Sequence, residues 1–306
     1  MLPPISGSTQ SYLDQLSQMQ TQMETLQQQV TSGYRLQNPG DDPSAVGAIG
    51  SVQTLIGQLV QNNTNLGQLQ TELQTGDGAL QQAIQAIDSA ASLASQSSSL
   101  MSNPAQQAAL LQQAQGILQT LVNISATTAD GRYIFSGDLD QQALYQVDST
   151  QPTGVMQLAT ATSTRTVTDA AGSPIWTAKT ATDIFDARNP DGTAAPQNVF
   201  AAVNSLITAL QANDITGAVN SISSLKAAGD YLNQQLGQYG IAESRVTDTL
   251  SKQNTLLVSE QAQLSGLRDT DVASAALQLN QLQVQQQAAL TSKAKMSQIS
   301  LFDFLA

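Results

Sequence analysis

Apolar residues recur at three- and four-residue steps through both ends of the chain, which is the period of one face of an α-helix. The pattern predicts amphipathic helices over residues 12–30 and 272–299, and we expect their apolar faces to be subunit interfaces. The predicted interface residues are Leu13, Leu16, Met19, Met23, Leu26 and Val30 near the N-terminus, and Val272, Ala276, Leu279, Leu282, Leu290, Met296, Ile299, Leu301, Phe302 and Phe304 near the C-terminus.

The outer faces of these two helices carry few charges. Residues 1–30 contain only Asp14 and Glu24 as charged residues, and residues 272–306 contain only Lys293, Lys295 and Asp303. A solvated amphipathic helix usually carries many charges on its polar face, whereas glutamine, serine and threonine fill these faces. We therefore expect the terminal helices to contact other protein chains. The alternative is a solvent-exposed, glutamine-rich coiled coil.

The helical period continues through most of the remaining chain. It covers residues 44–101 and 104–124, where Asn103 is expected to cap a helix that begins at Pro104, and it returns over 199–265. The segment Gly76-Asp77-Gly78 is expected to bend or interrupt the first of these helices. Because a long amphipathic helix cannot bury its apolar face alone, the N- and C-terminal halves are expected to pair.

Residues 131–198 have a different sequence pattern, in which short β-prone segments are separated by turn residues. The predicted fold is mainly α with a small inserted β domain, and the paired N- and C-terminal segments form a long antiparallel helical bundle or coiled coil. The predicted division is 1–43 and 266–306 for the two halves of a terminal coiled-coil domain, 44–130 and 199–265 for a helical core, and 131–198 for the insert.

The insert is expected to lie on the outside of an assembly and to be removable. It holds seven acidic and four basic residues, whereas the terminal helices are almost uncharged. It is also joined to the helices at only two points, so a short linker in place of residues 138–195 should close the gap at a modest entropic cost. A segment of proline, serine and glycine over residues 1–11 is expected to be flexible and to precede the first helix.

Composition narrows the possible functions. The net charge of −12 argues against binding to nucleic acid or to an anionic membrane. No apolar run approaches the ~20 residues of a spanning helix, and the first ten residues lack the features of a secretory signal. The chain has no cysteine and no histidine, which excludes disulfides, zinc sites with those ligands and Ser-His nucleophiles. We expect no catalytic residues, cofactor or metal.

A turn is expected directly after the first helix, at Arg35, Pro39, Asp41, Asp42 and Pro43. The prolines forbid a regular helix here, and Asp42 can cap a helix whose first residue is Pro43. Asp41 and Asp42 could instead form a metal or acid–base pair. Adjacent carboxylates rarely converge on one ion without further ligands, so a structural role is favoured.

Three blocks carry a resemblance to a known family. Residues 32–43, Ser-Gly-Tyr-Arg-Leu-Gln-Asn-Pro-Gly-Asp-Asp-Pro, resemble the block that follows the first helix in the flagellin superfamily. Within this block, Pro39 and Pro43 resemble the hook–filament junction family (hook-associated protein 3) more than the filament flagellins. Residues 131–137, Gly-Arg-Tyr-Ile-Phe-Ser-Gly, and the tail 298–305 also resemble the junction family. The start, Met1-Leu2-Pro3-Pro4, departs from the Met-Arg-Ile-Ser/Thr that is usual in that family.

The resemblance implies a structural subunit of the bacterial flagellum, needed for motility and not an enzyme. Such a subunit is exported unfolded by the flagellar type III apparatus without a cleaved signal peptide, and it becomes extracellular. It assembles with copies of itself into a layer between another hook-associated protein and flagellin, and an export chaperone binds its C-terminal region. The terminal helices of such a subunit line the export channel.

Two other functions remain open. A filament flagellin would have the same architecture, but Pro39, Pro43 and the Tyr133-Ile134-Phe135 segment speak against it. An extracellular coiled-coil scaffold, or a flagellin-like protein with an enzymatic insert, is the other. The scaffold does not explain the Arg35, Asp41 and Asp42 block, and the insert offers no convincing catalytic set.

Overall fold

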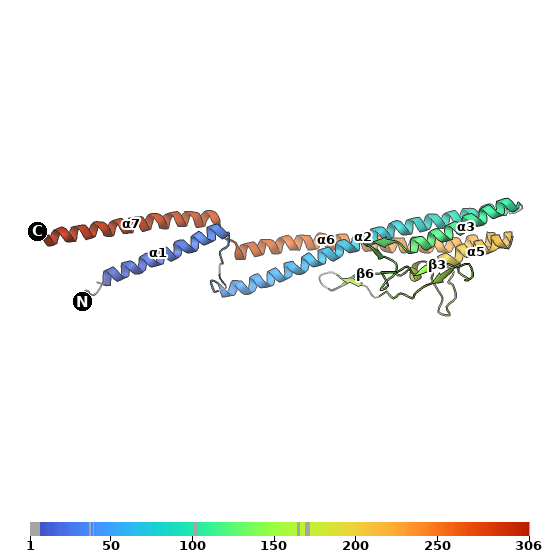
Figure 1. Cartoon of the computed structure of the whole chain (residues 1–306), viewed down its shortest axis with the longest axis horizontal. Helices are drawn as coiled ribbons and strands as arrows, with labels where there is room; N and C mark the ends of the chain where they lie inside the picture. Colours follow the sequence, from blue (N-terminus) through green and yellow to red (C-terminus); the bar gives the residue numbers. More distant parts are fainter. Residues whose placement is uncertain are drawn as a thin grey trace. The chain divides into compact units, whose positions relative to one another are not determined.

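The computed structural model describes residues 7–36, 38, 40–100, 103–163, 166–168 and 172–305, with side chains except at 7–9, 98–100 and 296–305. Its helices are α1 (Gly7–Ser32), α2 (Pro43–Leu100), α3 (Pro104–Ser125), α4 (Ala181–Ile184), α5 (Val199–Gln211), α6 (Ile215–Arg268) and α7 (Val272–Leu305) (Figure 1). Its strands are β1 (Thr128–Ala129), β2 (Arg132–Tyr133), β3 (Tyr145–Val147), β4 (Val155–Gln157), β5 (Thr166–Thr168) and β6 (Pro174–Thr177). The predicted class, mainly helical with a small β region, is confirmed. Within the described ranges, the helices are too short or too polar to cross a membrane.

The chain divides into two compact units, and each combines segments from both halves of the sequence. The first unit contains Met1–Gln58 and Leu256–Ala306, and the second contains Leu59–Thr255. The limits of the units therefore fall inside α2 and α6. The five-part division made from the sequence stays a prediction.

Several helix ends follow their sequence signals. Gly33 has a φ of 75° and donates its N–H to the Gln29 carbonyl at 2.8 Å, which is the expected termination of a helix by glycine. Asn103 accepts a hydrogen bond from Ala105 N–H at 3.0 Å, and α3 begins at Pro104 as predicted. The expectation that the first helix begins after residue 11 is wrong, because α1 already begins at Gly7. No proline follows Pro4 before residue 32, so nothing prevents the earlier start. Residues 1–6 of the segment expected to be flexible lie outside the described residues.

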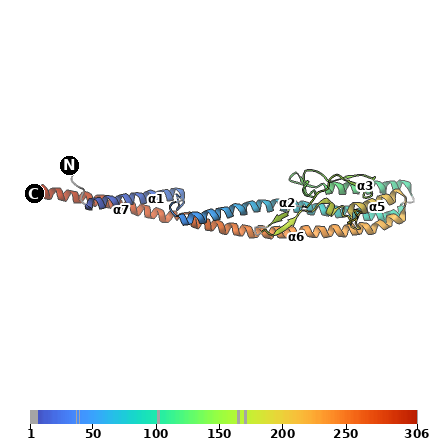
Figure 2. The ribbon, with the colours of Figure 1, turned by 90° about the horizontal axis from the view of Figure 1, so that it is seen from below.

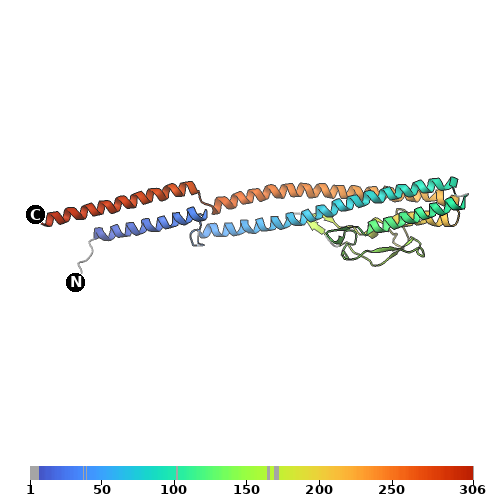
Figure 3. The same cartoon turned by 45° about the horizontal axis from the view of Figure 1, so that its top comes forward.

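The core of the second unit is a seam between α2 and α6, which run side by side and antiparallel there (Figures 2 and 3). Fully buried residues repeat every seven positions along α2, the spacing of a coiled coil. They are Leu59, Leu66, Leu73, Leu80 and Ile87. The corresponding buried series on α6 is Ala218, Leu225, Leu232, Tyr239 and Val246. Each helix thus buries one continuous stripe, as its sequence pattern predicts.

The interruption of α2 that was expected at Gly76 is wrong. The helix is continuous from Pro43 to Leu100, and Gly76 makes room for a ring of the facing helix. A Cβ at this position would collide with Cε1 of Tyr239, whereas a Cβ at Gly78 would meet nothing within 4 Å. The Tyr239 ring in turn packs against Trp176, with centroids 4.8 Å apart, and against Phe135. The glycine therefore has a packing role in the helix interior.

Two glycine-to-alanine variants test this assignment. Gly76→Ala should lower the free energy of unfolding by about 1–3 kcal/mol, because the buried Tyr239 ring has to leave its position between two other rings. Gly78→Ala is the matched control and should raise stability by up to about 1 kcal/mol, because alanine is the better helix former. Thermal and urea unfolding would measure both, and equal effects of the two variants would contradict the packing role.

The β region is three separate two-stranded antiparallel ribbons rather than one sheet: β1–β2, β3–β4 and β5–β6. Its aromatic side chains belong to the same contiguous apolar cluster as α2, α3, α5 and α6. Phe135 and Phe185 from the insert are fully buried with ring centroids 5.6 Å apart, and Phe185 stacks on Phe200 of α5 at 5.9 Å. The insert therefore shares one core with the helices.

A buried carboxylate also ties the insert to α5. Asp186 is fully buried and accepts hydrogen bonds from Arg188 at 2.7 and 2.9 Å, from the Tyr145 hydroxyl at 3.2 Å and from Asn198 Nδ2 at 2.7 Å. Burial, together with the Asp186 charge, raises the pKa of Tyr145, so the phenol keeps the proton that it donates. Asn198 accepts from Ala201 N–H at 2.8 Å and so caps α5. Both carboxylate oxygens have partners, which offsets the cost of burying the charge.

The shared core contradicts the expectation that the insert is removable. Replacing residues 138–195 by a linker would expose the apolar faces of α3 and α5 and remove Phe185, and we now expect this variant to lose cooperative unfolding. Phe185→Ala alone should cost about 3–5 kcal/mol, whereas Gln142→Ala, at an exposed position, should stay within about 0.5 kcal/mol of the parent. Calorimetry would decide, and an unchanged melting temperature for the deletion variant would restore the removable insert.

Candidate assembly interface

The terminal helices α1 and α7 pack against each other within the first unit, antiparallel and side by side (Figures 1 and 2). The α1 residues in this seam are half-buried: Leu16, Met19, Met23, Leu26 and Val30. The facing residues of α7 are Ala275, which is 4% exposed, and the half-buried Ala276, Leu279 and Leu282. Most of the predicted interface residues whose side chains the structure describes therefore lie in the seam with the other terminal helix of the same chain.

Three predicted interface residues lie outside this seam. Leu13, Val272 and Leu290 are 47%, 43% and 51% exposed. The side chains of Met296, Ile299, Leu301, Phe302 and Phe304 lie outside the described residues. Because the seam is already covered within one chain, a contact between chains needs a further face of these helices.

Such a face exists on α7 and was missed by the sequence reading. Leu277 and Val284 are 64% and 68% exposed, although leucine and valine are usually buried. Each follows a seam residue, Ala275 or Leu282, by two positions, which places it about 200° around the helix. Leu277 and Val284 are seven residues apart, which is visible in the sequence. The prediction assigned only one apolar stripe to each helix, so this second stripe was missed. No charged residue occurs from Val272 to Ser292.

A groove of about 480 Å³ lies between α1 and α7. Leu26 and Leu282 contribute its apolar residues, and the remaining lining residues are glutamines and threonines: Thr21, Gln22, Thr25, Gln29, Gln278, Gln281 and Gln285. These side chains can donate and accept hydrogen bonds without bringing a charge into a contact. The surface of the pair therefore suits protein contact on several sides.

The connection between α1 and α2 is hydrogen-bonded to the connection between α6 and α7. Arg35 N–H donates to the Arg268 carbonyl at 2.8 Å, and Thr270 N–H donates to the Gly33 carbonyl at 2.9 Å, around an antiparallel bridge of Tyr34 with Asp269. The two connections are 232 residues apart in sequence at Arg35 and Leu267. These hydrogen bonds hold the two connections together at the point where α1 is followed by α2 and α6 is followed by α7.

Side chains reinforce this joint between the connections. Arg35 Nη2 donates to the Leu267 carbonyl at 2.9 Å, and its Nη1 lies 3.7 Å from Asp42 Oδ2. The Arg268 guanidinium lies over the Tyr34 ring at 4.4 Å and donates to Asp269 at 2.8 Å. Tyr34, Arg268 and Asp269 were not found from the sequence, because nothing local shows that the two connections meet.

The acidic residues of the predicted turn act as hydrogen-bond acceptors. Asp42 accepts from Ala45 N–H at 3.1 Å and from the Ser44 hydroxyl at 2.6 Å, and Asp41 accepts from Asn38 N–H at 2.8 Å. The Ser44 hydroxyl, followed by the Ala45 N–H, lowers the pKa of Asp42. Pro39 lies outside the described residues. In the described part of the chain, no group of three acidic side chains could hold a metal ion.

Arg35 and Asp42 should respond differently to substitution. Arg35→Ala removes a charge-assisted hydrogen bond across the joint and should destabilise the first unit by about 1 kcal/mol, whereas Asp42→Asn keeps an acceptor for the cap and should have a smaller effect. Arg245→Ala, at an exposed position of α6, is the control. Limited proteolysis at the connections would report the loosening, and a larger effect of Asp42→Asn than of Arg35→Ala would contradict this order.

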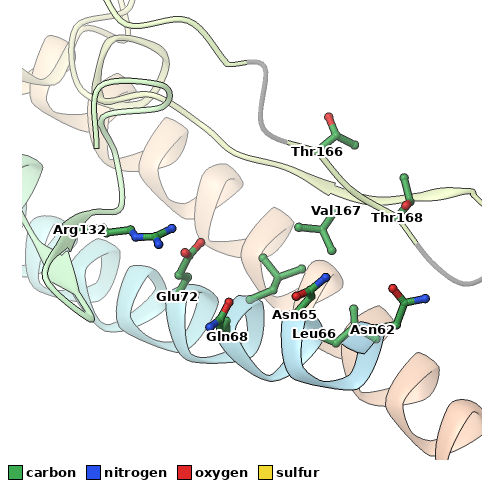
Figure 4. Close-up of a pocket in the computed structure, with 10 residues that line it drawn as sticks. Asn62, Asn65, Leu66, Gln68, Glu72, Arg132, Thr166, Val167 and Thr168 are labelled. Carbon is green, nitrogen blue, oxygen red and sulfur yellow. The ribbon is translucent and has the colours of Figure 1, made fainter. Parts of the chain in front are cut away.

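A cleft of about 260 Å³ lies in the second unit between α2 and β5 (Figure 4). Glu72 and Gln68 of α2 point toward Arg132, while Thr166, Val167 and Thr168 form the opposite side. Arg132 also lies 3.8 Å from Asp140 Oδ2. Among the residues that line this cleft, Glu72 is the one carboxylate, so they hold no acid–base pair.

The sequence matches two family models. The model of the bacterial flagellin N-terminal helical region matches residues 6–140, and that of the bacterial flagellin C-terminal helical region matches residues 215–305. Flagellar hook-associated protein 3 of Escherichia coli K12 is 28% identical over 195 residues, which cover 60% of this chain and 58% of the relative. The match thus spans less than two thirds of the relative's length.

Solved structures show a similar fold. A flagellar hook-associated protein 3 from Legionella pneumophila aligns with a TM-score of 0.59 at 12% identity, over 72% of this chain and 98% of that one. FlgL of Bacillus cereus aligns with a TM-score of 0.52 at 17% identity, over 73% of this chain and all of that one. At these identities the likeness concerns the fold.

Proposed function

This chain belongs to the bacterial flagellin family, and we propose that it is a structural subunit of the bacterial flagellum that forms the junction layer between hook and filament. The name of the Escherichia coli relative supports the junction role within that family. The observation that carries the structural role is the second apolar stripe on α7, in the uncharged segment 272–292, which nothing in the chain covers within the described residues.

Assembly would bury the surfaces that a single chain leaves exposed. Two packed helices are marginal in water, because each still shows most of its surface to solvent. Leu277 and Val284 expose apolar area that a neighbouring subunit could cover, at about 25 cal/mol per Å². Because residues 272–292 of α7 carry no charge, no charged side chain of this segment has to be desolvated when the helices pack together. The terminal coiled-coil domain of 1–43 and 266–306 would thus supply the contacts between subunits.

The partners follow from the same role. The layer would consist of copies of this chain, placed between another hook-associated protein and flagellin, and an export chaperone would bind the C-terminal region before export. Export would use the flagellar type III apparatus without a cleaved signal peptide, and the assembled subunit would be extracellular. A role without catalysis is supported by the absence of cysteine and histidine from the sequence.

Removal of the gene distinguishes the junction role from that of a filament flagellin. Cells without the junction subunit should build hooks that lack filaments and should shed flagellin into the medium, because export continues while the filament has no base. Cells without their flagellin would lose the filament and shed no monomer. Electron microscopy and analysis of the culture medium would separate the two outcomes, and the second would overturn the junction role.

Aspartate substitutions test the assembly face. Leu277→Asp or Val284→Asp should abolish assembly, because an unpaired buried charge costs several kcal/mol, while the melting temperature of the monomer stays unchanged. Leu282→Asp lies in the seam with α1 and should lower the stability of the monomer as well. Gln283→Asp brings the same charge to α7 outside both stripes and is the control. Normal motility of the Leu277 and Val284 variants would show that this face is not an interface.

A further inference from the structure

Polar residues interrupt the seam between α2 and α6 around Gln253. The buried series on α6 continues from Leu232, Tyr239 and Val246 to Gln253, which occupies the next seven-residue position and is 4% exposed. A glutamine therefore stands where the preceding turns carry large apolar side chains. Its neighbour Asn254 accepts a hydrogen bond from Asn63 Nδ2 of α2 at 2.9 Å. We name Asn63, Gln253 and Asn254 the amide layer.

The amide layer leaves buried polar atoms without partners. Neither the nitrogen nor the oxygen of the Gln253 amide has a hydrogen-bond partner, and Oδ1 of Asn63 has none. Among the other buried polar residues of the two helices, the Ser97 and Ser221 hydroxyls donate to backbone carbonyls at 2.6 Å, whereas Oε1 of Gln235 on α6 also lacks a partner. A buried polar group without a partner destabilises the packed state relative to a state in which water reaches it.

The apolar core is discontinuous at the same level. The contiguous cluster of the second unit reaches Leu66 on α2 and Val246 on α6. Leu59 is only 1% exposed but does not belong to that cluster. The amide layer therefore lies between two apolar stretches of one seam. It also lies close to Leu59 and Thr255, where the second compact unit ends.

We propose that the amide layer is a weak point at which the α2–α6 seam opens locally while the apolar stretches on both sides stay paired. Opening lets water reach the Gln253 amide and Asn63 Oδ1, which offsets part of the lost packing. The apolar stretches gain nothing from opening, because their side chains would meet water. The Asn63–Asn254 hydrogen bond lies at the edge of the seam, where Asn254 is exposed, and it re-forms when the two helices close in the same alignment.

Hydrogen exchange on the full-length monomer tests this proposal. Amides at 60–66 and 250–256 should exchange at least about tenfold faster than those of α2 and α6 at 73–90 and 225–242. Gln253→Leu should slow exchange at the layer to the rate of its flanks. Gln261→Leu, at an exposed position of the same helix, is the control and should leave it unchanged. Asn254→Ala breaks the amide pair and should speed exchange at the layer further.

Two results would contradict the proposal that the seam opens at the amide layer. One is equal protection of the layer and its flanks in the parent protein, which would mean that the amides find partners in solution. The other is an effect of Gln253→Leu that is spread evenly over α2 and α6, or absent at the layer. If the leucine variant fails to fold, Gln253→Met supplies the same comparison with an unbranched apolar side chain.

Discussion

Every long helix of this protein depends on a helix from the other half of the sequence to cover its apolar stripe. α1 pairs with α7, and α2 pairs with α6, so the first segments of the chain cannot be buried before the last ones are made. The joint of Arg35 with Leu267 and Arg268 follows from the same constraint. It links the connection between α1 and α2 to the end of α6, where the chain passes from one helix pair to the other. The insert is subject to it as well, since its aromatic residues complete the core that α3, α5 and α6 share.

This dependence explains how a chain with so few charges can be both stable and prepared for assembly. The second unit buries its apolar stripes within one chain, with aromatic rings and a fully hydrogen-bonded Asp186 at the end that carries the insert. In the first unit, α1 and α7 share one seam, and a second apolar stripe on α7 remains exposed. In the proposed junction layer, neighbouring subunits would cover this stripe.

Local signals in the sequence predicted the helices and most of their ends. Asn103-Pro104 and Gly33 work through backbone chemistry of neighbouring residues, so they can be recognised without knowing the fold. Long-range packing could not be recognised in this way. Gly76 looked like a helix breaker because the ring of Tyr239 that requires it comes from a distant helix. The insert looked separable because its sequence does not show that Phe185 stacks on Phe200. In the candidate interface, the helical period of apolar residues predicted the α1–α7 seam. The second stripe on α7 and the Tyr34–Asp269 bridge were not predicted.

The central claim is that the exposed stripe of α7 becomes buried between subunits. Because the chain has no cysteine, a single introduced thiol reports on one position. Val284→Cys should react with a maleimide in the dilute monomer, where the side chain is exposed, and should be protected in assembled flagella. Thr193→Cys, on an exposed turn of the insert, should react in both states. Equal labelling of Val284→Cys in the monomer and in the assembly would contradict the account.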